Sequence, residues 1–401
     1  MSGDVDPEVR RARAWLSRAV EPGSVAAWRF VEQSGPVAAA AALQAGAAPS
    51  EVQAVAGARA GEDTSLEDLH RADRCGGRLV VPEDPEWPAL PLHCLTLATE
   101  DGRGLVDGRQ PDRTRTLVPP LALWVRGAAS LTGLVDRSVA LVGSRASTAY
   151  GEHVAGELAH GLGERGWTTV SGGAFGIDAA AHRGALAAEA PTVAVLACGV
   201  DRVYPGAHSA LFARVLDEGL LVSEWPPGCA PLRHRFLVRN RLIAALTRGT
   251  VVVEAAARSG AQATANRARE LGKAVMAVPG PVTSAMSVGC HQLLREVERP
   301  VALVTSAAEV LEAVGRVGED LAPPVERASA PGDSLSDVAR RVLDACPVRV
   351  GVPPERLAAV AGCSVVDVLR VLPALELADL VEWTGTGWRV RRQSRKGEPA
   401  G

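Results

Sequence analysis

The sequence predicts an α/β protein built on a doubly wound parallel sheet. Between residues 138 and 315, apolar segments of strand length alternate with segments of helix length. This alternation is typical of β-α-β units, in which helices cover both faces of a parallel sheet. The segments of strand length are mostly apolar, as strands buried on both faces should be. The predicted strands are 139–142, 168–171, 192–196, 220–223, 250–254 and 274–278.

Smaller regions flank this predicted sheet. Residues 6–72 are expected to form short helices separated by glycines, as a packing module or, alternatively, as a helix-hairpin-helix that binds a DNA backbone. Near the C-terminus, three helical patterns precede a hairpin pattern over 380–391, which is the order of a winged helix. The expected domains are a helical domain over 1–75, the sheet domain over 76–318, a linker over 319–335, a winged-helix domain over 336–392 and a disordered tail over 393–401.

One stretch inside the sheet domain lacks a regular pattern. Residues 93–118 carry Gly, Asp, Arg and Pro without the periodicity of a helix or a strand. We therefore expect a surface insertion there, followed by a further strand over 121–125.

The composition excludes several classes of protein. Hydrophobic residues make up 47% of the 401 residues and charged residues 22%, which excludes a wholly disordered or fibrous chain. The 43 basic and 46 acidic residues give a net charge of -3, so a site for an anionic partner must be local. The seven cysteines include no C-x-x-C pair, which indicates neither a disulfide framework nor a zinc site. No apolar segment approaches the length of a membrane span, so we expect a cytoplasmic protein with no membrane partner.

Glycine and small polar residues follow the predicted strands. In an open parallel sheet, ligands bind outside the carboxyl ends of the strands, where helix N-termini also offer free N–H groups to anions. The alternative is ordinary turn chemistry, but glycine after nearly every strand favours a binding rim. The candidate residues of this rim are Gly143, Ser144, Arg145, Ser171, Gly172, Gly173 and Gly280.

The loop over 143–148 indicates which anion binds. It lacks the G-x-G-x-x-G pattern of dinucleotide sites, and the chain has no G-x-x-x-x-G-K-[ST] motif. A nicotinamide enzyme and a P-loop enzyme are therefore disfavoured, and we expect no cofactor. Ser144 and Arg145 instead place a hydroxyl and a guanidinium beside a helix N-terminus, which predicts a phosphate cradle.

A second group of candidates lies in the segment 233–241, Arg-His-Arg-Phe-Leu-Val-Arg-Asn-Arg. It holds four arginines and Phe236 but no acidic residue. Arginines at this density suit a nucleic-acid backbone, and an aromatic ring offers a base a face for stacking. The alternative is a solvated helix end with Phe236 in the core and with Arg241 turned inward as a scaffold. A third group, Ser259 and Gly260, either caps a helix that faces the same rim or is a plain N-cap.

Six motifs occur in one order along the chain. They are Val139-Ala-Leu-Val-Gly-Ser-Arg145, Val170-Ser-Gly-Gly-Ala-Phe-Gly-Ile-Asp-Ala-Ala-Ala-His182, Cys198-Gly-Val-Asp-Arg-Val-Tyr-Pro205, Phe236-Leu-Val-Arg-Asn-Arg-Leu-Ile-Ala244, Val252-Val-Glu-Ala255 and Val278-Pro-Gly280. Together they resemble the motifs of the DNA-processing protein DprA (Smf) family. The resemblance is specific over about residues 76–310 and loose in the flanking regions.

This resemblance implies an extended Rossmann-like domain that binds single-stranded DNA. It also implies a homodimer that protects incoming DNA and loads the RecA recombinase during natural transformation, without catalysis. The residues that match the family's phosphate-binding motif are Gly143, Ser144 and Arg145. Those in its basic, aromatic DNA-contacting segment are Arg233, Phe236, Arg239 and Asn240. One position departs from the pattern, because many members have a basic residue where Phe175 stands.

Two other functions stay open at this point. Related Rossmann-like proteins hydrolyse nucleoside monophosphates with a Pro-Gly-Gly-x-Gly-Thr loop and a glutamate, whereas this chain has Pro279-Gly-Pro281 and, as its candidate carboxylate, Glu254. A winged-helix regulator would instead prefer duplex DNA of defined sequence. Nucleotide hydrolysis, single-strand binding and duplex binding are the measurements that separate the three functions.

Overall fold

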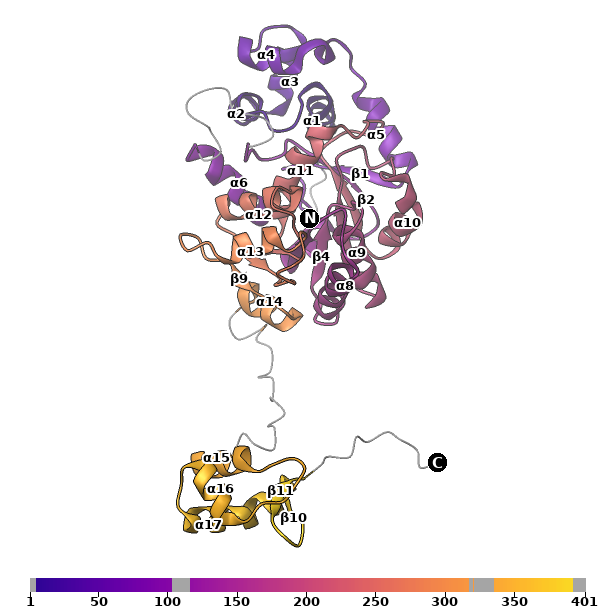
Figure 1. The fold of residues 1–401 in the computed structure, drawn as a ribbon. Coiled ribbons are helices and arrows are strands. Elements are labelled where there is room, and N and C mark those ends of the chain that lie inside the picture. Colours follow the sequence, from indigo (N-terminus) through magenta and orange to yellow (C-terminus); the bar gives the residue numbers. More distant parts are fainter. Residues whose placement is uncertain (1–4, 103–115, 317–319, 321–334, 392–401) are drawn as a thin grey trace. The chain divides into compact units, whose positions relative to one another are not determined.

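The computed structural model describes residues 5–102, 116–316, 320 and 335–391. The chain forms two compact units, Met1–Ala322 and Pro323–Gly401 (Figure 1). The linker expected over 319–335 lies outside the described residues except at its positions 320 and 335, and the tail expected over 393–401 lies wholly outside them. The other domain boundaries remain predictions.

A sheet of nine strands runs through the first unit, in the order β1-β2-β6-β5-β4-β3-β7-β8-β9. The pairs from β6 to β9 along that order are parallel, whereas β1 and β2 add an antiparallel edge at β6. The strands are β1 Gly77–Val80, β2 Leu123–Arg126, β3 Ser138–Val142, β4 Thr168–Ser171, β5 Thr192–Val195, β6 Leu220–Ser223, β7 Gly249–Val252, β8 Ala274–Ala277 and β9 Ala302–Leu303. Every predicted strand is present within two residues of its expected bounds. The predicted α/β class with a doubly wound sheet is therefore confirmed.

Helices cover both faces of this sheet (Figure 1). One face packs against α8 (Ala149–Gly163), α9 (Ile177–Ala187), α10 (Ser209–Glu218) and α14 (Ala307–Val314). The other face packs against α6 (Ala89–Glu100), α7 (Leu131–Asp136), α11 (Arg233–Leu246), α12 (Gly260–Glu270) and α13 (Val288–Leu294). Alternate residues of each strand enter the two cores, because successive side chains of a strand point to opposite faces. In β3, Leu141 packs in the first core and Ala140 in the second.

The helical segment, residues 5–75, packs against the antiparallel edge of the sheet. Its helices are α1 Pro7–Ala19, α2 Val25–Ser34, α3 Pro36–Gln44, α4 Ser50–Ala56, a 3₁₀ turn Gly57–Gly61 and α5 Ser65–Arg74. Asp6 and Ser24 cap α1 and α2 by accepting backbone N–H groups of the first turn. Apolar residues of α1 and α5 share one core with β1 and β2. Trp124 of β2 also donates its indole N–H to the Ser17 hydroxyl over 3.2 Å. The helical segment and the sheet therefore share one packed interior.

The surface insertion expected over 93–118 is wrong for the parts that the structure describes. Residues Ala89–Glu100 form α6, and the side chains that this helix buries are Leu92, Leu95, Ala98 and Thr99. Pro91 lies in the first turn of the helix, where backbone N–H groups have no intrahelical partner, so it does not break the helix. Residues 116–118 are buried as well, and 103–115 lie outside the described residues.

The second unit contains three helices followed by a β-hairpin, in the predicted order. The elements are α15 Asp337–Ala345, α16 Pro354–Ala361, α17 Val365–Leu377, β10 Val381–Trp383 and β11 Trp388–Val390. Leu357 of α16 and Leu372 of α17 lie in its core. The assignment of this unit as a winged helix remains a prediction. Among the described residues, no single helix is long and apolar enough to cross a membrane, and α16 with α17 meets that length and composition only as a pair bent by 105°.

A buried ion pair joins the middle of α11 to the end of β6. The Arg241 guanidinium donates to both carboxylate oxygens of Glu224 over 2.6 and 2.8 Å. The two side chains are 1% and 3% exposed. Arg241 is therefore turned inward as a scaffold. Each charge depends on the other, because an isolated charge in a protein core is strongly disfavoured.

We predict that Glu224→Gln destabilises the first unit, because the variant leaves the Arg241 charge buried without a counter-charge. The expected loss is about 3–5 kcal/mol of unfolding free energy, measured by urea unfolding. The matched control is the double variant Glu224→Leu, Arg241→Met, which removes both charges and should be about as stable as the original chain. A double variant less stable than the single one would contradict this account of the pair.

Candidate functional site

A cleft of about 480 Å³ lies at the carboxyl ends of β3 and β7. The chain leaves β3 through α8 toward β4 on one side, and it leaves β7 through α12 toward β8 on the other. The cleft therefore occupies the topological switch point of the sheet, where open α/β folds bind ligands. The predicted site residues that line it are Gly143, Ser144, Arg145, Phe236, Arg239, Asn240, Ser259 and Gly260. Their role in binding stays a prediction.

The loop after β3 is fixed by backbone hydrogen bonds on both sides. The Ser144 N–H donates to the Glu254 carbonyl over 2.8 Å, and the Ser144 carbonyl accepts the Ile177 N–H over 3.2 Å. A Cβ at Gly143 would lie 2.4 Å from the Ile177 side chain, so glycine is required at this position. The loop is thereby held in one conformation, and it leaves the Arg145 side chain exposed.

Glu254 stabilises this loop through hydrogen bonds. Its side chain is 1% exposed. Its two carboxylate oxygens accept the N–H and the hydroxyl of Thr148 over 2.9 and 2.6 Å. The same Thr148 hydroxyl caps the N-terminus of α8. Both oxygens of Glu254 thus make hydrogen bonds within the protein, which favours a structural role. Glu254 is the residue on which the hydrolase alternative depends.

The Arg239 side chain reaches from α11 to the carboxyl ends of β4 and β5. Its guanidinium donates to the Gly172 carbonyl over 2.9 Å and also to the Val195 carbonyl, and the residue is 4% exposed. A Cβ at Gly172 would lie 2.5 Å from this guanidinium, so the contact requires glycine there. Burial lowers the pKa of Arg239 to about 10, although the Asp178 carboxyl opposes the shift. The group therefore stays charged at neutral pH.

The other arginines of the segment 233–241 differ in exposure. Arg233 is exposed at the start of α11 and does not line the cleft. Arg235 is buried and pairs with Glu21 of the helical segment over 2.8 Å. Arg241 is buried in its own ion pair. Two of the four arginines are thus neutralised inside the protein, so their density in the sequence overstates the charge that this segment offers to a ligand.

Phe236 lies at the cleft beside a cation and a second aromatic ring. The Arg145 guanidinium lies 5.0 Å from the centroid of the Phe236 ring. The Tyr204 ring lies 5.7 Å away, centroid to centroid. Phe236 also packs against a small cluster of buried residues that includes Trp225. Its ring therefore lies at the boundary between the core and the cleft. The two sequence-based interpretations, a core residue and a face for base stacking, each describe part of its surroundings.

The N-terminus of α12 opens onto the same cleft. The Ser259 hydroxyl caps this helix by accepting a first-turn N–H over 3.4 Å. The Asn240 side-chain amide donates to the Gly260 carbonyl over 3.4 Å, which ties α11 to this turn. The space beside Gly260 is open, and Arg258 also lines the cleft. Ser259 is thus an N-cap, and the helix that it caps faces the rim. The structure fits both sequence-based interpretations of this residue.

The remaining predicted site residues do not line the cleft. They are Ser171, Gly172, Gly173, Arg233 and Gly280. Ser171 is fully buried, and its hydroxyl donates to a carbonyl of β3 over 2.6 Å. The Gly173 carbonyl accepts from the His208 ring over 3.1 Å. The Gly280 carbonyl accepts from the His291 ring over 3.0 Å. The buried serine and the two glycines thus make contacts within the protein at the rim.

Several residues at the cleft were not among the predicted site residues. Asp178 and Arg258 line it, and Tyr204 lies beside Phe236. Burial raises the pKa of the Asp178 carboxyl, whereas nearby Arg239 lowers it. Tyr204 is 46% exposed in the loop after β5. An aromatic residue in a loop at the carboxyl edge of the sheet is the signal that could have identified it.

Comparison with known proteins gives consistent results. The family model of DNA recombination-mediator protein A matches residues 103–315 of this chain. A putative DNA processing protein DprA of Mycobacterium tuberculosis is 46% identical over 388 residues, which cover 97% of this chain and 96% of that protein. The protein Smf of Escherichia coli is 37% identical over 287 residues, which cover 70% of this chain and 75% of that protein.

A solved structure supports the same relationship. The X-ray structure of DNA processing protein A (DprA) from Streptococcus pneumoniae has a TM-score of 0.60 and 28% sequence identity to this chain, and it covers 78% of this chain and 99% of that one. This match supports the Rossmann-like character of the sheet domain. The motifs, the fold and the relatives agree, and the chain therefore belongs to the DNA processing protein DprA (Smf) family.

Proposed function

We propose that the cleft binds single-stranded DNA without reading its sequence. Family membership gives the chain a DNA-processing role. The observation that carries the proposal is the pair of Arg145 and Phe236, in which a guanidinium lies 5.0 Å from an aromatic ring at an open cleft. Such a pair offers a phosphate a positive charge and an unpaired base a stacking surface at one place.

The charge of the lining also favours a phosphate backbone. Arg145, Arg239 and Arg258 contribute positive charge, and Asp178 is the one carboxyl among the described residues of the lining. The N-terminus of α12 adds the partial positive charge of a helix dipole. Stacking on Phe236 requires a base with a free face, and the faces of bases in a duplex are covered by their neighbours. These features together favour a single strand over a duplex.

The hydrolase alternative has less support. Glu254, its candidate residue, holds the N-cap of α8 with both carboxylate oxygens. Asp178, the carboxyl that does line the cleft, accepts the Ala174 N–H over 3.3 Å and lies close to the buried charge of Arg239. We therefore propose binding without catalysis and without a cofactor.

The regulator alternative depends on the second unit. On α17, the helix that would enter a major groove in a winged helix, Val366, Leu369 and Leu377 are 59%, 53% and 90% exposed. These positions fall on one side of the helix by their spacing, together with the exposed Arg370. Recognition helices present polar side chains to base edges, so a mostly apolar side with one arginine suits duplex reading poorly. We propose that the second unit is a winged helix that contributes little to single-strand affinity.

The proposed cellular role follows the family. We propose that the chain is a cytoplasmic homodimer that protects incoming single strands and loads RecA during natural transformation. Family membership is what supports these partners. The molar mass in solution tests the homodimer, and capture of purified RecA by the chain bound to a single strand tests the second partner.

We predict tighter binding to a single strand than to a duplex of the same sequence, measured by fluorescence anisotropy with labelled oligonucleotides. The affinity should fall with salt, with a log–log slope of about −0.7 for each phosphate neutralised, because bound counterions are released. Mixed-sequence strands of equal length should bind alike. Equal affinity for duplex and single strand would count against the proposal.

The same measurement on a chain that ends at Ala322 separates the two units. The cleft lies wholly within the first unit, so the shortened chain should keep most of its single-strand affinity. A shortened chain that is folded but no longer binds would instead move the site to the second unit.

We predict that Arg145→Ala weakens single-strand binding roughly tenfold, because a charge-assisted contact to phosphate is lost. The salt slope should become shallower by about 0.7, the value for one phosphate. The melting temperature should not change, because the side chain is exposed. Arg214→Ala, at an exposed position of α10, is the matched control and should bind like the original chain. Equal affinities for the two variants would refute the phosphate role.

We predict that Phe236→Ala weakens single-strand binding about ten- to a hundredfold, since stacking of a base on an aromatic ring contributes ~1–3 kcal/mol. The variant also loses some stability, because the ring is partly packed in the core. Phe236→Leu is therefore the control, because it keeps most of the apolar volume but removes the aromatic face. Urea unfolding and oligonucleotide affinity are measured on both variants. Normal binding by Phe236→Leu would exclude the stacking role.

A further inference from the structure

A buried carboxylate of the helical segment contacts the first turn of α11. Glu21 lies between α1 and α2 and is 7% exposed. One of its oxygens accepts from Arg235 Nε over 2.8 Å and from the Trp225 indole N–H over 2.9 Å. The other oxygen accepts from Arg235 over 3.1 Å and from Arg59 over 2.7 Å. Glu21 thus joins the helical segment, the loop after β6 and α11.

The Glu21 carboxylate stays ionised at neutral pH. Burial raises its pKa, but hydrogen bonds from Arg59, Arg235 and Trp225 outweigh the burial and lower the pKa to about 2. The Arg235 guanidinium also lies 5.4 Å from the Trp225 ring centroid and donates to the Ala230 carbonyl over 3.0 Å. These contacts hold the Arg235 side chain in one geometry.

The first turn of α11 depends on this contact. Arg235 is the third residue of the helix, and the N-cap residue Leu232 makes no side-chain hydrogen bond to the turn. A carboxylate close to a helix N-terminus is also favourable to the helix dipole. The residue after Arg235 is Phe236, which lines the cleft. A shift of this turn would therefore move the Phe236 ring relative to Arg145.

We propose that Glu21 is a positioning residue for the DNA-binding face of α11. It is not among the residues that line the cleft, and it acts through Arg235 on the placement of the Phe236 ring. The inference rests on the proposed binding of single strands by the cleft. It makes the helical segment, for which the sequence suggested a packing module or a helix-hairpin-helix that binds a DNA backbone, a support of the DNA-binding face of α11.

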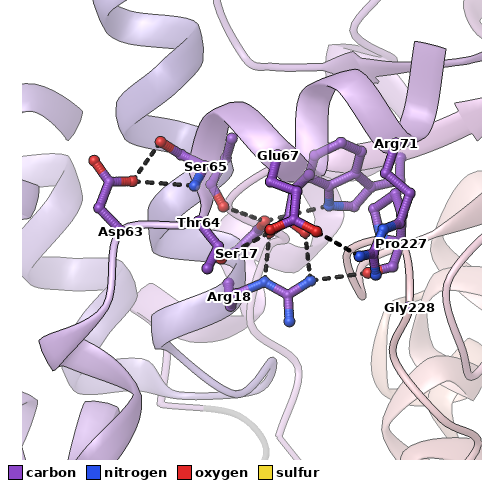
Figure 2. Close-up of polar contacts among 12 residues, drawn as sticks. Ser17, Arg18, Asp63, Thr64, Ser65, Glu67, Arg71, Pro227 and Gly228 are labelled. Carbon is purple, nitrogen blue, oxygen red and sulfur yellow. Dashed lines mark hydrogen bonds and ion pairs between the residues drawn. The ribbon is translucent and has the colours of Figure 1, made fainter. Parts of the chain in front are cut away.

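A neighbouring ion pair provides a matched control. Arg18 of α1 pairs with Asp68 of α5 over 2.6 Å. Arg18 also donates to the Pro227 carbonyl over 2.8 Å (Figure 2). Asp68 is 2% exposed. This pair, like Glu21, ties the helical segment to the loop after β6, but its contact is with that loop and not with α11. Asp68→Asn therefore perturbs the same junction without acting on the Phe236 ring.

Hydrogen exchange on the full chain without DNA tests the local effect. Glu21→Gln keeps the shape of the side chain and removes its charge. Backbone amides of residues 237–239, which donate to the carbonyls of the first turn, should then exchange about tenfold faster, while those of α8 should not change. Asp68→Asn should leave the amides of 237–239 as they are. Unchanged exchange at 237–239 in Glu21→Gln would overturn the proposal without reference to DNA.

Single-strand affinity tests whether Glu21→Gln weakens DNA binding by displacing the Phe236 ring. Glu21→Gln should weaken binding about tenfold, and Asp68→Asn by less than about twofold. In the Phe236→Leu background, Glu21→Gln should cost less than about twofold, because the ring that it positions is absent. A further tenfold loss in that background would show that the two effects are independent, and the positioning role would be wrong.

The outcomes separate this inference from the proposed function. Tight binding by Arg145→Ala would contradict the cleft as the DNA site, whatever Glu21→Gln does. Normal binding and normal exchange in Glu21→Gln, with weak binding by Arg145→Ala, would contradict the positioning role alone. If Glu21→Gln does not fold, Arg235→Met breaks the same contact from the α11 side and leaves Glu21 paired with Arg59. The same results are then expected from that variant.

Discussion

The cleft is organised around one buried cation. Arg239 bridges α11 to the carboxyl ends of β4 and β5 through the Gly172 and Val195 carbonyls. A guanidinium can be buried at this depth because main-chain carbonyls accept from it and the Asp178 carboxyl lies nearby. The contact excludes any side chain at Gly172. Arg239 therefore ties the helix that lines the cleft to the ends of the two strands.

Arginines fix α11 at three levels along its length. Arg235 binds the helical segment, Arg239 binds the strand ends, and Arg241 binds the residue after β6. Each arginine uses several of its donors, which gives each contact a defined direction. A helix held in this way cannot rotate without breaking buried polar contacts, and such contacts are costly to leave unsatisfied. These contacts therefore hold α11, and Phe236 with it, in one orientation relative to the sheet.

The sequence predicted the sheet because strands buried on both faces are apolar along their whole length. The carboxyl-edge rule then placed Gly143 and Ser259 in one cleft, although they are far apart in the chain. The helix α6 was missed because a proline stands in its first turn and because the apolar residues Leu90 and Leu97 lie on its exposed side, which hides its periodicity. The sequence offered the inward turn of Arg241 as an alternative, but it gave no sign that Arg235 is buried, because its partner Glu21 lies far outside the segment 233–241. Pairing of this kind is a property of the tertiary structure and leaves no local pattern.

An acidic chain can hold a site for an anion because electrostatic interactions in salt solution are short-ranged. At physiological ionic strength, exposed charges are largely screened beyond about 8 Å, so the net charge of -3 has little effect at the cleft. There, Arg145, Arg239 and Arg258 outweigh Asp178. The arginines that are paired inside the protein add nothing to this balance. Under the proposed function, binding of a strand depends on a few unneutralised charges and on one aromatic ring, so the placement of α11 matters more than the total number of arginines in the segment.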